Sequence, residues 1–122
     1  MRNISFMLTR DQVLARTKDV TRRLGWRNVR VGEDLRGCEK CQGLRRGEHV
    51  VQLALIRVVA VRFEPLRRMT DDLEYGFEEV RREGFADHPT LRWPSVWVDW
   101  FCSSHRGCTL DTEVTRIEFT YL

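Results

Sequence analysis

The stretch "VVQLALIRVVAVRF", residues 50–63, carries the clearest strand pattern in the chain. Its odd positions are apolar except for Arg57, whereas its even positions include Gln52 and Arg62. Successive side chains of a strand point to opposite faces, so this period of two places one apolar face against a core. The stretch therefore predicts a long β-strand with one buried face.

Three further segments predict strands. Residues 3–8, "NISFML", read as a short first strand, and the turn "VGEDLRG" leads into a brief strand around Leu35. Residues 115–121 alternate in the same way as the long strand and predict the last one. The polar, glycine-bearing stretch "CEKCQGLRRGEH", residues 38–49, is predicted to be a loop.

The same reasoning predicts a short helix directly after the first strand. Thr9 has the residue type of an N-cap, and Gln12 three positions later completes a capping-box pattern. We expect this helix to end near Arg16 or Thr17.

A second helix is predicted from Thr70, as its N-cap, to the αL stop at Gly84. Leu73, Phe77 and Val80 recur at helical spacing and predict its core-facing stripe.

A third helix is predicted to run to about Ser104, with Ser95 as its N-cap. Its expected packing face consists of Val96, Trp97, Trp100 and Phe101.

This order of elements predicts an α+β fold in which helices cover one opening of a small, half-open β-barrel. The length of 122 residues suits a single domain, residues 1–122. Hydrophobic content of 42% and charged content of 32% exclude a disordered chain. No apolar run approaches the roughly 20 residues of a membrane-spanning helix. We expect a cytoplasmic protein with no membrane partner, and we favour a monomer.

Positive charge is concentrated in one non-helical segment, residues 16–30, which holds six cations and one carboxylate. A solvated, Arg-rich loop is one interpretation of that composition. The other is a binding surface, on which cations neutralise phosphates and Trp26 stacks on a base. The cations of this predicted surface are Lys18, Arg22, Arg23, Arg27 and Arg30.

The motifs "FMLTRDQVLARTKDVTRRLGW", "GEDL", "EKCQGLRRGE", "LIRVVAVRFEPL", "EGF" and "VTRIEFTYL" follow one another in an order that resembles ASCH domains. More narrowly, the chain is similar to the short stand-alone ASCH-like proteins of bacteriophages and bacteria. The resemblance implies a PUA-like fold, a small β-barrel with helices around one mouth, and a role with RNA or modified nucleosides.

Some small ASCH proteins are amidohydrolases that remove the acetyl group of N4-acetylcytidine. Their Lys, Thr, Arg and Glu correspond by resemblance to Lys18, Thr21 and Arg23 of "KDVTRR" and to Glu83 of "REGF". The cysteines of this chain depart from the pattern of those enzymes.

Amide hydrolysis requires a nucleophile, a proton acceptor and a group that stabilises the oxyanion. Lys18 can activate Thr21 or a water if burial or neighbouring Arg residues lower its pKa. Glu83 can shuttle the proton. Residues 18 and 21 of a regular strand would point to opposite faces, so this set requires a turn or bulge near Asp19 and Val20.

The cysteines form two pairs, in "CEKC" and in "CSSHRGC". Paired ligands at this spacing are typical of structural zinc sites. Five ligands are available for four positions, and burial as small apolar side chains is the alternative use. The candidate metal ligands are Cys38, Cys41, Cys102, His105 and Cys108.

Three functions follow from these patterns. The first is a binding module for RNA or a modified nucleoside with a basic cleft, and the second is a nucleoside amidohydrolase. The third is a zinc-stabilised adaptor for another protein. Lys18, Thr21 and Glu83 within hydrogen-bond reach would favour the enzyme, whereas an Arg-lined groove would favour the binding module.

Overall fold

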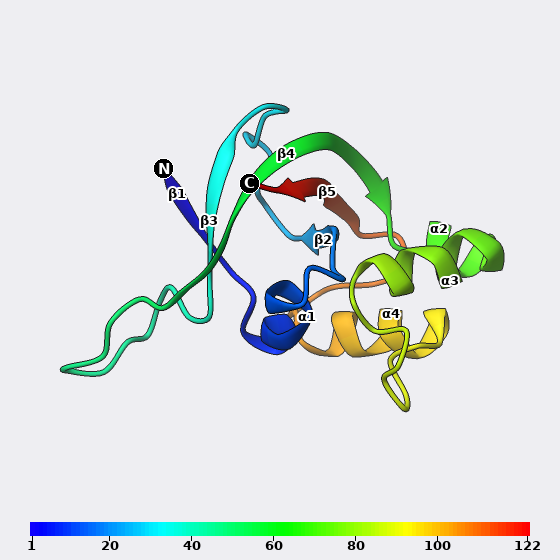
Figure 1. Cartoon of the computed structure of the whole chain (residues 1–122). Helices are drawn as coiled ribbons and strands as arrows, with labels where there is room; N and C mark the ends of the chain where they lie inside the picture. Colours follow the sequence, from blue (N-terminus) through cyan, green and yellow to red (C-terminus); the bar gives the residue numbers. More distant parts are fainter.

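The computed structural model describes residues 1–122 as a curled, mixed five-stranded sheet with four α-helices (Figure 1). The α+β half-barrel predicted from the sequence is confirmed. The strands are β1 (Arg2–Ser5), β2 (Val20–Arg23), β3 (Asp34–Cys38), β4 (Gln52–Pro65) and β5 (Glu113–Tyr121). The helices are a 3₁₀ turn η1 (Met7–Thr9), α1 (Arg10–Leu14), α2 (Arg68–Asp71), α3 (Leu73–Arg82) and α4 (Pro94–Ser103).

The sheet has the strand order β1-β3-β4-β5-β2. β1 pairs with β3 in parallel, and every other pairing is antiparallel. β4 has 14 residues and pairs with both β3 and β5, so the predicted long strand is the centre of the sheet. β1 and β2 are the two edges, and between them lies the open side of the half-barrel.

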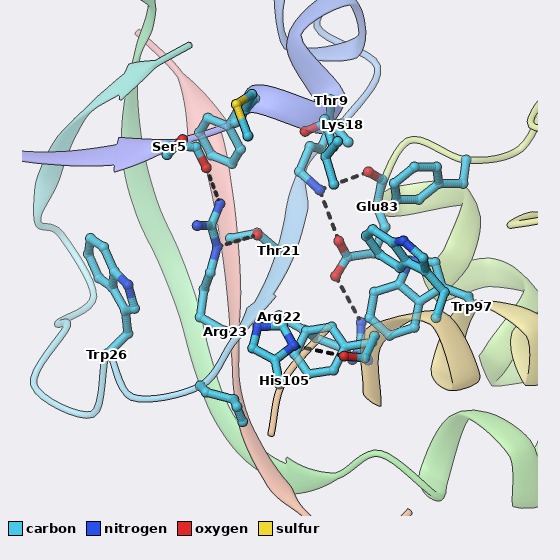
Figure 2. A pocket seen from close by; sticks show the side chains of 17 residues that line it. Ser5, Thr9, Lys18, Thr21, Arg22, Arg23, Trp26, Glu83, Trp97 and His105 are labelled. Carbon is cyan, nitrogen blue, oxygen red and sulfur yellow. Dashed lines mark hydrogen bonds and ion pairs between the residues drawn. The ribbon is translucent and has the colours of Figure 1, made fainter. Parts of the chain in front are cut away.

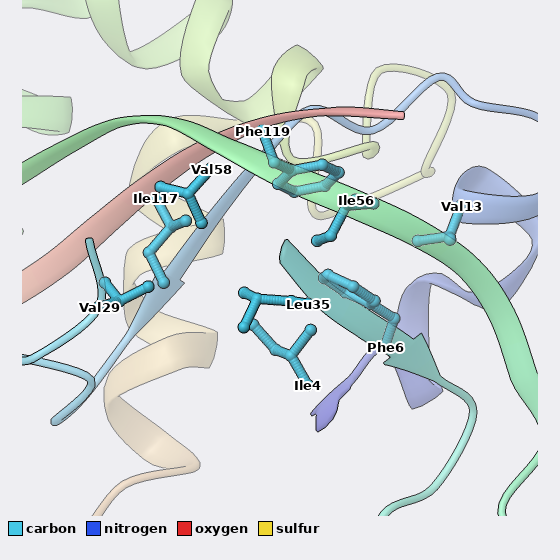
Figure 3. Close-up of a cluster of buried hydrophobic side chains, with 9 residues drawn as sticks. All are labelled: Ile4, Phe6, Val13, Val29, Leu35, Ile56, Val58, Ile117 and Phe119. Atoms are coloured by element: carbon cyan, nitrogen blue, oxygen red, sulfur yellow. The ribbon is translucent and has the colours of Figure 1, made fainter. Parts of the chain in front are cut away.

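Two apolar clusters stabilise the fold. The first lies inside the curled sheet, where residues from β1, β3, β4, β5 and α1 meet (Figure 3). The second joins α2, α3 and α4 to the start of β5. Figure 1 shows α1, α3 and α4 gathered at one side of the sheet, as the prediction of helices over one opening requires. None of the helices is both long enough and apolar enough to span a bilayer.

The first strand and helix are shorter than predicted. β1 ends at Ser5 because the backbone turns at Phe6 (φ −124°, ψ 44°) into η1. Thr9 is the N-cap of α1, but its side chain makes no capping hydrogen bond. Gln12 instead donates from Nε2 to the carbonyl oxygen of Gly84, 3.1 Å away, so the predicted capping box is wrong. The side chain of Gln12 makes a tertiary contact in place of a local one.

The predicted second helix is divided into α2 and α3 at Asp72, whose backbone is extended (φ −120°, ψ 97°). Asp72, not Thr70, is the N-cap, and its side chain accepts a 3.1 Å hydrogen bond from the backbone of Tyr75. Of the predicted core stripe only Val80 is buried, and the prediction is wrong for Leu73, which is 57% exposed, and Phe77, which is 43% exposed.

α3 instead buries Gly76, Glu79 and Val80. A Cβ on Gly76 would lie 2.0 Å from the carbonyl oxygen of Met69, so only glycine allows α2 and α3 to pack this closely. The close packing at Gly76 therefore determines which face of α3 is buried. The spacing of apolar residues in the sequence does not show this contact.

α4 begins at Pro94 with Trp93 as its N-cap, so Ser95, the predicted N-cap, lies inside the first turn. Proline suits the first turn of a helix because it lacks a backbone N–H that would need a partner. Trp97 and Phe101 are buried as predicted, and Trp100 is half-buried. Val96 was also predicted to be buried, but it is exposed, and Val98 is buried instead.

Candidate functional site

A cavity of about 410 Å³ opens between the end of β1, the strand β2 and the helices α3 and α4 (Figure 2). Its walls combine buried ionic side chains with apolar and aromatic ones. The lining residues used below are Ser5, Lys18, Thr21, Arg22, Arg23, Trp26, Glu83, Phe85, Trp97, Trp100, Phe101 and His105. All four positions assigned through the ASCH resemblance, Lys18, Thr21, Arg23 and Glu83, therefore face one cavity.

Lys18 and Glu83 form a buried ion pair at the wall of this cavity. The Lys18 ammonium lies 2.9 Å from Glu83 Oε2 and donates a second hydrogen bond of 2.8 Å to the backbone carbonyl of Glu83. Only 3% of the Lys18 side chain and 5% of the Glu83 side chain are exposed. The pair is thus removed from bulk water, and its Coulomb attraction is stronger than it would be in water.

Local backbone structure brings these two residues together. Lys18 precedes β2, and the backbone N–H of Asp19 donates to the carbonyl oxygen of Arg82 at the end of α3, 3.0 Å away. Glu83 is the C-cap of α3, and Gly84 follows with a φ of +101°, which favours glycine. β2 begins at Val20, so Lys18 lies just before the strand, and both Lys18 and Thr21 line the cavity.

Arg23 connects Thr21 to the opposite edge of the sheet. Its Nε donates a 3.0 Å hydrogen bond to Thr21 Oγ1, and its Nη2 donates to the carbonyl oxygen of Ser5 in β1. Figure 2 shows the guanidinium between these two partners. Arg23 therefore bridges the two edge strands of the half-barrel and leaves the hydroxyl proton of Thr21 free to be donated elsewhere.

Burial changes the ionisation of both cations. Desolvation lowers the pKa of Lys18 below its usual value, although the carboxylate of Glu83 opposes that change. Desolvation also lowers the pKa of Arg23, against the attraction of Glu83. A lysine whose pKa is lowered has more neutral amine near neutral pH, as a general base requires.

Several buried polar atoms of the cavity have no hydrogen-bond partner. Glu83 Oε1 and Arg22 Nη1 lie 3.6 Å apart, which is an ionic contact but too long for a hydrogen bond. The indole Nε1 of Trp97 and Nε of Arg22 are unpartnered as well. An unpaired buried polar group costs about 1–3 kcal/mol, so these atoms favour a polar ligand or water in the cavity.

Aromatic rings form the wall opposite β2. The rings of Trp97 and Phe101 stack with centroids 5.3 Å apart, and His105 stacks on Phe101 at 4.3 Å. Trp100 contacts both Trp97 and Phe85. Flat apolar surfaces beside unpaired polar atoms suit a planar ligand that carries hydrogen-bonding groups.

An ionic network beneath the cavity was not predicted from the sequence. Arg22 donates to Glu79 Oε1 at 2.7 Å and contacts Glu64 and the hydroxyl of Tyr75. Arg116 of β5 binds both oxygens of Glu79. Burial would raise the pKa of Glu79, but the hydrogen bonds from Arg116 and Arg22 outweigh it and lower the pKa to about 2.

One sequence pattern could have suggested this network. Glu79 and Glu83 are four residues apart, hence on one face of α3, and that face contains the buried Val80. Two carboxylates on a buried helix face require cationic partners, and β2 supplies Arg22.

The predicted cationic surface is only partly assembled. Lys18, Arg22 and Arg23 line the cavity, and the ring of Trp26 is half-buried at its edge. Arg30 and Arg27 are exposed and do not line it.

Arg27 is instead paired with Glu113 at 2.6 Å and lies over the ring of Phe63. Residues 16–30 are therefore neither a uniformly solvated loop nor a continuous basic groove.

The predicted metal ligands lie in two places. Cys38 is buried in β3, and Cys41 is half-buried in the following loop, where burial and Cys38 raise its pKa to about 11. Cys102 and Cys108 have their sulfur atoms 3.2 Å apart, and burial and Cys108 raise the pKa of Cys102 to about 11.

His105 Nδ1 lies 2.8 Å from the carbonyl oxygen of Phe101. No three His, Cys, Asp or Glu side chains are grouped as a metal site. The zinc site stays a prediction that metal analysis can test.

Comparisons with solved structures identify the fold. The chain is similar to an ASCH domain from Lactobacillus crispatus JV V101, with a TM-score of 0.63 and 14% identity over 98% of this chain and 78% of that one. It is also similar to protein EF3133 from Enterococcus faecalis V583, of family DUF984, with a TM-score of 0.52 and 13% identity over 94% of this chain and 70% of that one. No family model and no curated protein matches the chain. The chain therefore has the ASCH, PUA-like fold that its motifs predict.

Proposed function

We propose, from the fold that this chain shares with ASCH domains, that the cavity binds a modified nucleoside and that Lys18, Thr21 and Glu83 hydrolyse an acyl amide on it. The observation that carries the proposal is the buried contact of 2.9 Å between Lys18 Nζ and Glu83 Oε2, in a cavity that Thr21 also lines. A base and a proton shuttle are thereby in contact in a cavity that a hydroxyl group also lines. The hydrogen bond of Thr21 Oγ1 is with Arg23, and none joins it to Lys18 or Glu83, so of the three side chains only Lys18 and Glu83 are within hydrogen-bond reach of each other.

Each of these side chains has a role in such a reaction. The neutral amine of Lys18 accepts the proton of Thr21 as its oxygen attacks the amide carbon, and Lys18 passes a proton to Glu83. The hydrogen bond from Arg23 Nε to Thr21 Oγ1, 3.0 Å long, stabilises negative charge on that oxygen. The proton returns to the leaving nitrogen, and water then hydrolyses the acyl-threonine ester. A water molecule activated directly by Lys18 gives the same products without the ester.

The aromatic wall supports a nucleoside as the ligand class. Trp97 and Phe101 are buried and stack on each other, so the half-buried Trp100 offers the ring for stacking. The unpartnered Glu83 Oε1 and Trp97 Nε1 offer an acceptor and a donor. Base–aromatic stacking contributes about 1–3 kcal/mol per base. The cavity of about 410 Å³ lies within the usual range for small-molecule sites.

The test is turnover of acylated nucleosides, beginning with N4-acetylcytidine, followed by chromatography of the released base and acid. We expect Lys18→Ala and Thr21→Val to lower kcat by about 10²–10⁴-fold, the usual contribution of acid–base catalysis. The matched controls are Lys40→Ala and Thr120→Val, because both residues lie outside the cavity. Unchanged turnover in Lys18→Ala would exclude the proposed chemistry.

The second candidate is binding of RNA or a nucleoside without hydrolysis. It is favoured by Trp26, whose half-buried ring lines the cavity and has the Arg2 guanidinium 5.0 Å from its centroid. Saturable binding of cytidine-containing RNA by wild-type protein, lost in Trp26→Ala, together with no turnover of any acylated nucleoside, would support this candidate over the enzyme.

A further inference from the structure

The thiols of Cys102 and Cys108 are in contact, and neither the fold nor the proposed chemistry accounts for this. Cys102 lies near the end of α4, Cys108 lies in the loop that follows, and their sulfur atoms are 3.2 Å apart. Both are free thiols and both are half-buried.

Two successive turns bring the chain back to α4. The backbone N–H of His105 donates to the carbonyl of Cys102 at 3.2 Å, and that of Cys108 donates to the carbonyl of His105 at 3.1 Å. Gly107 has a φ of +77°, and a Cβ placed there would meet no atom within 4 Å. The close approach of the two thiols thus follows from backbone hydrogen bonds and from a glycine in the left-handed region.

We propose that Cys102 and Cys108 are a reversible oxidation site, at which a small-molecule disulfide converts the two thiols into an intramolecular disulfide bond. A disulfide has an S–S distance of about 2.05 Å, so the sulfurs must approach by roughly 1.1 Å. The open surroundings of Gly107 allow the loop to make this movement. This site is independent of the amidohydrolase proposal.

The reaction is an exchange of two thiols for one disulfide. The thiolate of one cysteine attacks a sulfur of the small disulfide, forms a mixed disulfide and releases one small thiolate. The thiolate of the other cysteine then attacks the protein sulfur of the mixed disulfide and releases the second small thiolate. The protein pair loses two electrons and two protons, and the small disulfide is reduced to two thiols.

A disulfide bond between Cys102 and Cys108 would restrain part of the cavity wall. His105 lies between the two cysteines in the chain, lines the cavity and stacks on Phe101 with ring centroids 4.3 Å apart. A cross-link between residues 102 and 108 closes the short loop that carries His105. Closing this loop reduces the conformational freedom of the unfolded chain and restrains the position of the imidazole.

The experiment incubates the purified full chain with oxidised glutathione and analyses it without reduction. Trypsin cleaves after Arg92, Arg106 and Arg116, so the two cysteines fall on separate peptides, residues 93–106 and 107–116. We expect these peptides to be joined, with a mass lower than their sum by two hydrogens, and to separate after reduction. The oxidised protein should melt about 5 °C higher than the reduced protein.

Two variants make the result specific. Cys108→Ser should abolish both the cross-linked peptide and the rise in Tm, whereas Cys41→Ser should retain both. Absence of the linked peptides in wild-type protein would overturn the proposal. So would stoichiometric zinc that protects both thiols, because the pair would then be a metal ligand set.

Discussion

Lys18 Nζ lies 2.9 Å from Glu83 Oε2, although 65 residues separate the two in the chain. The contact joins the segment before β2 to the C-cap of α3, and both side chains are almost fully buried. Burying an ion pair costs desolvation energy that its attraction barely repays, so such a pair adds little net stability. Net stabilisation of the fold is therefore not a sufficient explanation of this pair.

Removal of one partner should destabilise the protein because the other charge stays buried without compensation. We expect Lys18→Met to lower the free energy of unfolding by about 3–5 kcal/mol. Adding Glu83→Gln should restore part of that loss, with a coupling of about 1–3 kcal/mol in the double-mutant cycle. Urea denaturation measures all four proteins, and Lys40→Met, at an exposed pair, should change stability by less than about 0.5 kcal/mol. Strictly additive effects of the two substitutions would contradict a buried ion pair.

Lys18 should titrate below the ordinary lysine value of 10.5, because burial lowers its pKa. The chain has only two lysines, so ¹³Cε-labelled protein gives two NMR signals, with that of the more exposed Lys40 as the internal reference. Glu83 raises the pKa of Lys18 against the effect of burial, and Glu83→Gln should therefore move the Lys18 midpoint still lower.

The lowered pKa of Lys18 also determines how its contribution to stability changes with pH. Between its folded pKa and 10.5, folded Lys18 holds fewer protons than unfolded Lys18, so its contribution to stability rises with pH across that interval. A Lys18 midpoint at or above 10.5 would contradict the buried environment.

Glu79 should make the fold sensitive to acid. Its folded pKa of about 2 lies below the unfolded value of 4.5, so its stabilising effect is complete above pH 4.5 and is lost as pH falls toward 2. At pH 7, Glu79→Gln should lower the free energy of unfolding by about 3 kcal/mol, because Arg22 and Arg116 lose their shared carboxylate. The difference between wild type and variant, from urea unfolding at several pH values, should shrink steadily below pH 4.5. A difference independent of pH would show that the charge of Glu79 is not the cause.

Gly76→Ala should destabilise the protein, although alanine is ordinarily better than glycine inside a helix by about 0.5–1 kcal/mol. The added Cβ would lie 2.0 Å from the carbonyl oxygen of Met69 and 3.0 Å from Pro94 Cβ, so α2 and α4 must move. We expect a loss of about 1–3 kcal/mol, measured as a lower Tm. Glu74→Ala, at an exposed position of the same helix, serves as the control. A higher Tm in Gly76→Ala would show that the helices are not in close contact at this residue.

Local patterns in the sequence were sufficient for four of the five strands and for the approximate places of the helices. They did not predict β2 (Val20–Arg23), which lies within the basic segment of residues 16–30. The alternation of residues 50–63 predicted β4, and that of residues 115–121 predicted most of β5, because burial on one face of a strand leaves a period of two. The ASCH resemblance brought Lys18 and Thr21 forward as site residues, and both line the cavity. These predictions depend on residues close together in the chain.

Tertiary packing decided the rest. Which face of α3 is buried follows from the contact of Gly76 with Met69, and a helical pattern alone favoured the wrong face through Leu73 and Phe77. Ion pairs between residues far apart in the chain cannot be predicted from one sequence either. Nothing near Glu79 in the sequence indicates which cations will pair with its carboxylate. The sequence by itself therefore determined every strand except β2, and the candidate reactive groups. Only folding determined which charges are buried together, since burial, not spacing, sets their partners and their pKa values.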